Sequence, residues 1–203
     1  MPPKPKFTRE EVVEAALRLI SEKGTDALTA RELGERLGSS ARPIFTTFRN
    51  MEELMGEVRK AAMQKYEAFV GDAVHYTPVF KRFGTQMIRF ATEEPKLFQL
   101  LFMRENDASA TFSSLAAFLG PTRGLCIDAI VQDYGLAPDE ADAFFEHMWV
   151  FTYGLSVLCA TGMCRFGEEE VCAILGREFL GMMTLMKHGN WNAPTPSPAL
   201  QNS

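Results

Sequence analysis

The residues of this chain best suited to metal binding or nucleophilic catalysis are its cysteines and histidines, and their spacing favours neither role. They are Cys126, Cys159, Cys164 and Cys172, together with His75, His147 and His188. No two cysteines form a C-x-x-C pair and the histidines lie far apart, so we predict no metal site and no cofactor. An all-α enzyme would need Cys126 or Cys164 beside His147, and neither cysteine has a recognisable activating setting. We therefore predict that the chain is not an enzyme and that its cysteines are buried, reduced thiols.

A group of hydrogen-bonding side chains, with hydroxyl or guanidinium groups, lies between residues 40 and 49. Its members are Ser40, Arg42, Thr46, Thr47 and Arg49. Such side chains bind phosphate oxygens and the edges of bases. Residues 1–50 hold nine Lys and Arg against seven Asp and Glu, whereas the rest of the chain holds twelve against nineteen, within a net charge of −5. This asymmetry indicates that an anion could meet the N-terminal end.

Helix signals surround this group and predict how it is positioned. Thr8 and Glu11 have the spacing of a capping box, and the helix that they begin should end at Gly24. Thr29 and Glu32 have the same spacing before a short helix that stops at Gly38. A third short helix is expected from about residue 41 to 48, with Ser40 as its N-cap and a proline in its first turn. Asn50 should cap a fourth, long helix that continues to about residue 70.

The second and third of these helices are joined by a tight turn at residues 38–40. A side chain at Gly34 would face the junction, so a small residue there lets the two helices pack at a steep angle. This is the helix-turn-helix arrangement, in which the second helix enters the major groove of DNA. Ala41, Arg42, Thr46 and Thr47 should lie on the groove side. Arg42 could grip guanine, contact a phosphate or remain a solvated charge.

The remaining sequence predicts helices throughout. From residue 78 onward apolar residues recur at helical spacing, with breaks at Pro95, at residues 120–121 and at Gly135, and residues 190–203 read as a loose tail. The helix from about residue 139 to 159 and the final helix to about residue 188 are apolar most of the way round, so each should be buried on two sides. One side can face the subunit's own core and the other a partner; a single thick monomeric core is the alternative.

Residues 148–164 carry no charge and approach the lower length limit of a membrane span. No aromatic belt or basic flank frames them, and residues 1–25 lack the apolar run of a signal peptide. We interpret this stretch as a buried helix and predict a cytoplasmic protein without membrane contact.

The N-terminal quarter resembles the tetracycline-repressor (TetR) family. The similarity rests on residues 8–24, Leu28–Thr29, Arg31–Leu33 and Leu37–Gly38, and continues through Ser40, Pro43–Phe45, Phe48 and Glu52–Leu54. Beyond residue 60 only the helical outline is similar. The family usually has Tyr where Phe45 stands, Lys where Met51 stands and frequently His where Thr47 stands, so two phosphate anchors are missing. Phe45 could pack inward beside Ile44 and Phe48, or face the DNA backbone.

This resemblance implies an all-α fold with a DNA-binding domain at residues 1–50, including a helix-turn-helix motif at about 29–48, and a regulatory and dimerisation domain at residues 51–189. It implies a repressor that binds a palindromic operator in double-stranded DNA as a homodimer and is released by a small, mostly apolar effector. A helical protein-interaction module without DNA binding is the alternative to it.

The expected functional residues fall into three groups, for DNA contact, effector binding and dimerisation. DNA contacts are expected from Lys4, Lys6, Thr29, Arg31, Ser40, Ala41, Arg42, Pro43, Phe45, Thr46, Thr47 and Arg49. The resemblance implies an effector pocket, for which the candidate lining residues are Met87, Arg89, Phe90, Phe98, Phe102, His147, Met148, Trp149 and Tyr153. The dimer interface that it implies would use Phe144, Phe145, Phe151, Leu155, Ile174, Leu175, Phe179 and Met183.

Overall fold

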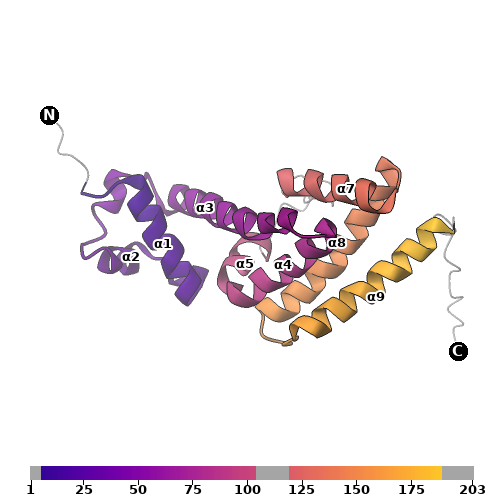
Figure 1. Ribbon diagram of the computed structural model, residues 1–203. Helices are drawn as coiled ribbons and strands as arrows, with labels where there is room; N and C mark the ends of the chain where they lie inside the picture. The colour runs from indigo at the N-terminus through magenta and orange to yellow at the C-terminus, as the bar shows by residue number, and fades with distance from the viewer. Residues whose placement is uncertain (1–5, 104–118, 189–203) are drawn as a thin grey trace, which may run out of the picture.

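The computed structural model describes residues 6–103 and 119–188, and the regular elements in these two stretches are all helices (Figure 1). The all-α prediction is therefore confirmed. Lys4 and the predicted tail at 190–203 lie outside the described residues. The α-helices are α1 (Arg9–Lys23), α2 (Ala30–Arg36), α3 (Met51–Gly71), α4 (Val79–Glu93), α5 (Pro95–Phe102), α7 (Pro121–Tyr134), α8 (Pro138–Ala160) and α9 (Glu168–Lys187). Short 3₁₀ helices are η1 (Thr25–Ala27), η2 (Ile44–Thr46) and η3 (Asp72–His75).

The helix starts follow the capping signals closely. The Thr8 hydroxyl accepts the Glu11 amide N–H at 3.2 Å, and the Glu11 carboxylate accepts the Thr8 amide N–H at 2.8 Å. The Asn50 side chain accepts the Glu53 amide N–H at 2.8 Å and so begins α3. These interactions satisfy amides that have no partner within the helix.

The second predicted capping box is only half formed. The Thr29 hydroxyl accepts the Glu32 amide N–H at 3.1 Å, as expected. The Glu32 carboxylate, however, forms an ion pair with Lys23 of α1 instead of returning to the backbone of Thr29. A charge-assisted contact between helices replaces the local hydrogen bond, and it ties α2 to the end of α1.

The molecule is elongated, with a small head and a larger body joined by α3 (Figure 1). The head comprises α1, α2 and the segment up to Asn50, and α1 packs against the first part of α3. In the body, α8 packs most extensively on α4 and also contacts α5, α7 and α9. Tyr66 anchors α3 in the body, because its ring lies edge-on against Phe90 at 5.2 Å and Phe102 at 5.0 Å.

A polar joint connects the two parts beside α3. The Ser21 hydroxyl of α1 donates to one oxygen of Glu94 at 2.7 Å, and the Lys65 ammonium of α3 donates to the other at 2.5 Å. Burial opposes ionisation of Glu94, but these two hydrogen bonds outweigh it and lower the pKa of the carboxyl group. The joint therefore holds a charged carboxylate between head and body at neutral pH.

Within the described residues, α8 is the helix that is long and apolar enough to cross a membrane by length and composition. Its buried side chains include Phe144 and Met148, and α4, α5, α7 and α9 pack around it. These contacts bury part of α8 inside the subunit, while Val150 on the same helix is exposed, and α8 ends at Ala160, short of the predicted stretch 148–164.

Candidate nucleic-acid interface

The turn between α2 and the following segment depends on two glycines. A Cβ atom at Gly34 would lie 2.8 Å from the carbonyl carbon of Ser40 and 2.9 Å from the amide nitrogen of Ala41. These are backbone atoms that cannot move aside, so only glycine allows so close an approach. Gly38 adopts a φ of +63°, which favours glycine, and reverses the chain. The sequence-based role of Gly34 is confirmed.

The segment after this turn differs from the prediction. Residues 41–48 do not form a regular α-helix: only Ile44–Thr46 is helical, and it is a 3₁₀ helix. The amides of Ile44, Phe45 and Thr46 each bond the carbonyl three residues earlier, at 3.1–3.2 Å, and the i→i−4 bond appears only at Phe48. Pro43 explains the difference, because it lacks an amide hydrogen and disfavours α conformation in the residue before it.

An arginine clamp holds the segment in place. The Arg9 guanidinium donates to the Thr47 carbonyl at 2.8 Å, pairs with the Glu53 carboxylate at 3.1 Å and lies 4.2 Å from the centre of the Phe48 ring. Glu53 also accepts the Arg49 amide N–H at 2.8 Å. The hydrogen bond from the Arg49 backbone, followed by that from Arg9, lowers the pKa of Glu53. Residues 47–53 are thus fixed to both α1 and α3.

Sequence reasoning gave Arg9 no role, although a signal for one exists. Arg9 is the first residue of α1, where the helix dipole disfavours a positive charge. A cation in that position needs a compensating partner, and Glu53 supplies it from 44 residues away in the sequence.

The clamp and the turn divide the segment into a buried and an exposed side. Ile44 and Phe48 are 0% and 2% exposed and belong to the head's apolar core. Phe45 is 46% exposed, so of its two predicted orientations it takes the outward one. Ser40, Arg42, Thr46 and Arg49 are also exposed, whereas Ala41, Pro43 and Thr47 are partly exposed. The Lys6 ammonium donates to the Ser39 hydroxyl at 3.0 Å, which brings the N-terminal arm beside this surface.

The cations of this surface differ in how free they are to meet a ligand. Arg31 is paired with Glu35 at 3.0 Å, and Arg49 is paired with Glu53 at 3.4 Å. Among the residues that the structure describes, the side chain of Arg42 makes no hydrogen bond or ion pair. Its guanidinium group is therefore fully available. The Thr29 hydroxyl is already engaged at the start of α2.

The nine predicted pocket residues do not surround one cavity. Met87, Met148 and Trp149 line a small cavity of about 40 Å³, whereas Phe90, Phe98 and Phe102 are buried in the aromatic core around Tyr66. Three polar candidates are engaged elsewhere. Arg89 pairs with Glu93 at 2.5 Å on the surface, His147 contacts Glu178 at 3.0 Å, and the Tyr153 hydroxyl donates to the Phe102 carbonyl at 2.9 Å.

The predicted interface residues are also divided. Phe144 and Phe145 are 0% and 3% exposed within one subunit, and Leu155, Leu175 and Met183 are likewise buried. These five side chains offer a partner almost no surface. Phe151, Ile174 and Phe179 are partly exposed. The exposed apolar side chains of α8 and α9 are instead Val150, Leu180 and Leu185. Helical periodicity alone does not separate the side facing the subunit's core from the outward side.

The four cysteines are free thiols, and Cys126 is buried. Burial raises the pKa of its thiol, which keeps it protonated and unsuited to act as a nucleophile. Cys159, Cys164 and Cys172 are only partly buried, so the prediction that every cysteine is buried was wrong for these three.

Comparison with known proteins finds similarity to bacterial regulators. Residues 12–58 match the family model described as bacterial regulatory proteins, tetR family. A TetR-like transcriptional regulator from Rhodococcus sp. RHA1 is structurally similar, with a TM-score of 0.61 at 12% identity, over 92% of this chain and 100% of that one. A second transcriptional regulator from the same strain has a TM-score of 0.59 at 15% identity, over 90% and 97% of the two chains.

A third similar structure is described as a TetR-family transcriptional regulator from Mesorhizobium loti MAFF303099. It has a TM-score of 0.55 at 16% identity, over 90% of this chain and 98% of that one. No curated protein matches the sequence. At identities of 12–16% these similarities show a shared fold, and they cover 90–92% of this chain.

Proposed function

We propose that this chain, whose residues 12–58 match the model of the tetR family of bacterial regulatory proteins, is a dimeric repressor that a small molecule releases from its operator. It is a DNA-binding transcriptional regulator, not an interaction module that lacks DNA binding. The observation that carries this function is the exposed side of residues 40–49, which lies on a turn locked by Gly34 and a clamp made by Arg9. We assign DNA binding to residues 1–50 and regulation to residues 51–189, in a cytoplasmic protein without catalytic activity.

Each exposed side chain has a role that its chemistry supports. Arg42, whose side chain is exposed and unpaired among the described residues, is proposed to read guanine in the major groove, where its planar guanidinium group can donate two hydrogen bonds to one base. Thr46 and Thr47 offer methyl groups to thymine. Arg49 and Lys6 are proposed to contact phosphates, which fixes the register of the protein on the duplex.

Phe45 and Met51 supply no phosphate contact by hydrogen bond or charge. Each missing phosphate contact should flatten the dependence of binding on salt concentration by about one unit of slope. The protein is therefore expected to bind its operator with a shallow salt dependence, with Arg42 carrying much of the specificity.

Dimerisation is proposed to use the outward sides of α8 and α9. Val150 on α8 and Leu180 and Leu185 on α9 are large apolar side chains that are 45–64% exposed. Phe151 and Ile174 are partly exposed on the same two helices. Two copies joined there would bind a palindrome with half-sites roughly 34–36 Å apart.

Release is proposed to work by a shift between two conformations of the dimer. A ligand that binds the body better in one conformation changes the spacing of the two heads by its differential affinity and no more. The α3 helix is suited to transmit this change, since Tyr66 holds it in the body and Asn50 and Glu53 hold it in the head.

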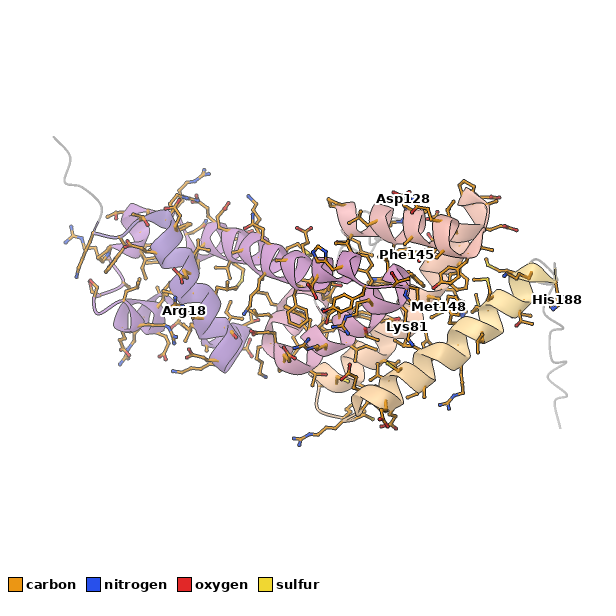
Figure 2. The ribbon with its side chains drawn as sticks, in the orientation of Figure 1. Arg18, Lys81, Asp128, Phe145, Met148 and His188 are labelled. Atoms are coloured by element: carbon orange, nitrogen blue, oxygen red, sulfur yellow. The ribbon has the colours of Figure 1, made fainter. Side chains whose placement is uncertain are left out.

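Footprinting of the DNA that flanks the gene, with a gel-shift series on the protected site, tests the function. We expect one protected palindrome. Arg42→Ala should weaken binding by about 1–3 kcal/mol and relax the preference at one base pair of each half-site. Arg18→Ala is the matched control, because Arg18 is an exposed arginine paired with Glu14 in the half of α1 that contacts the body (Figure 2).

The outcomes separate the possible roles. An equal loss of affinity on every DNA sequence would assign Arg42 to a phosphate. The absence of any protected palindrome at low salt would overturn the repressor function.

A further inference from the structure

A cavity of about 300 Å³ lies where α4, α8 and α9 meet. This volume is at the lower end of the range of about 300–1,000 Å³ found for small-molecule sites. Most of its walls are apolar side chains: Phe80, Tyr134, Met148, Leu175, Phe179 and Leu180. Of the pocket residues predicted from the sequence only Met148 is among them. Figure 2 labels Met148 and Lys81, which line the cavity from α8 and α4.

The cavity has one cation in its lining, and that cation is available. Lys81 is exposed, and among the described residues its ammonium group makes no hydrogen bond or ion pair. It lies in the first turn of α4, which contains no acidic residue and no side-chain cap. No carboxylate lines the cavity, so nothing in its wall neutralises Lys81.

A second polar group lies in the same wall. The Tyr134 ring packs against Phe179 at 4.9 Å, and its hydroxyl has no hydrogen-bond partner among the described residues. Burial, and to a lesser degree the charge of Asp133, raises the pKa of this phenol. The hydroxyl therefore stays protonated and can donate a hydrogen bond. Thr152 contributes less, because its hydroxyl already donates to the Met148 carbonyl at 2.7 Å.

We propose that this cavity binds a small amphipathic carboxylate, with its hydrocarbon part between α4, α8 and α9 and its carboxylate on the Lys81 ammonium and the Tyr134 hydroxyl. A neutral apolar ligand would leave both donors unused. A single lysine balances one negative charge, which favours a monoanion over a doubly charged group. The idea that this ligand is the effector rests on the proposed function, whereas the binding itself does not.

The position of the cavity connects it to the DNA-binding head. The α4 helix packs against α3, which carries the head, and against α8, which is proposed to form the dimer. A ligand between α4 and α9 can therefore favour one placement of α4 relative to α3. Such a bias is what release from DNA requires.

Calorimetric titration of the full-length protein with octanoate, flanked by hexanoate and decanoate, tests the site, and octanamide serves as the uncharged analogue. We expect octanoate to bind at least about tenfold more tightly than octanamide, because a charge-assisted contact is lost in the amide. Lys81→Gln should remove this difference by weakening octanoate alone. Lys60→Gln, which removes an exposed lysine of α3 remote from the cavity, should leave the difference intact.

Two glycines of α9 supply a matched pair of variants for the apolar part. Gly176 lines the cavity, Gly181 does not, and an added Cβ meets nothing within 4 Å at either position. Gly176→Leu should place a side chain in the cavity with no clash at its Cβ atom, and should abolish binding of the carboxylates and of octanamide. Gly181→Leu should leave binding unchanged.

Three results would overturn the inference: no binding by any of the three carboxylates, equal affinity for octanoate and octanamide, or binding that survives Gly176→Leu. Octanoate binding that depends on Lys81 in a protein that recognises no operator would keep the site and reject the repressor. A protected palindrome without octanoate binding would support the repressor function and reject the ligand site.

Discussion

The head and the body are both helical, yet different interactions hold them together. In the head, Thr8 and Asn50 cap helices, Arg9 bridges to Glu53, and Gly34 permits a contact between backbones. Each of these depends on one residue type in one position. In the body, aromatic and aliphatic side chains fill the space between α3, α4, α5, α8 and α9, and rings pack at centroid distances of about 5–6 Å.

This contrast indicates that the head mainly determines the geometry of DNA binding, whereas the body mainly determines the stability of the fold. The head has to present residues 40–49 in a single arrangement to a rigid duplex, and directional polar contacts do this well. Under the proposed function the body has to accommodate two arrangements and a ligand, and non-directional apolar packing tolerates both. Substitutions in the body should therefore cost more stability, whereas those in the head should cost more DNA affinity.

The largest loss of stability is expected in the body. Phe98 is fully buried and its ring lies 4.9 Å from Phe102, so Phe98→Ala should reduce the free energy of unfolding by about 3–5 kcal/mol. Urea denaturation measures this change. Val74→Ala, at a side chain that is 45% exposed, should change it by less than about 0.5 kcal/mol. A cost below about 1 kcal/mol for Phe98→Ala would mean that the body does not depend on this packing.

Gly34→Ala should have a smaller effect on stability but a selective one on the head. The new methyl group would collide with the backbone at Ser40 and cost about 1–3 kcal/mol. Amide exchange should accelerate in residues 30–50 and not in α8, and operator affinity should fall more than global stability.

Gly56→Ala provides the comparison for this prediction. It also replaces a helical glycine, but its Cβ would enter open space, so it should stabilise α3 by up to about 1 kcal/mol. Equal behaviour of the two variants would disprove the close approach at Gly34.

The same contrast explains what the sequence could predict. Capping pairs and breaks are local signals, so the ends of α1, α3, α4 and α8 were predicted within a residue or two. The role of Gly34 was also predicted, because a turn four residues later makes its environment local. The irregular 41–48 segment was missed, since helical spacing was given more weight than the restriction that Pro43 imposes.

Long-range features were not predictable in this way. Arg9 and Glu53 are far apart in the sequence, and no pattern links them. In the body, Phe and Met occupy most sides of the helices, so periodicity does not distinguish Phe144 in the core from Leu180 on the surface. The cavity depends on how α4, α8 and α9 cross, which explains why Lys81 and Tyr134 were not anticipated.

Asn50→Ala should remove the cap of α3 and cost about 1 kcal/mol, a loss between those of the core and the surface. Because the same residue begins the helix that joins head to body, operator affinity should fall with stability. The melting temperature and a gel shift measure the two effects. Asn50→Asp retains an acceptor for the Glu53 amide and should restore both; if it restores neither, the cap is not the cause.

The smallest expected effect is a pH dependence confined to the head. Hydrogen bonds from the Arg49 backbone and from Arg9 lower the pKa of Glu53 in the folded protein. A carboxyl group with a depressed folded pKa stabilises the fold above its ordinary value of about 4.5 and loses that contribution as the pH falls through the folded value. In operator-free protein, the protection of amides 47–53 against exchange, relative to the intrinsic rate at each pH, should therefore fall as the pH drops from about 6 to about 3. Glu53→Gln should flatten this dependence while leaving that of α8 unchanged. If the exchange of Glu53→Gln instead depends on pH as it does in the original protein, Glu53 does not hold residues 47–53 in place. The head would then depend less on specific polar contacts than its comparison with the apolar body suggests.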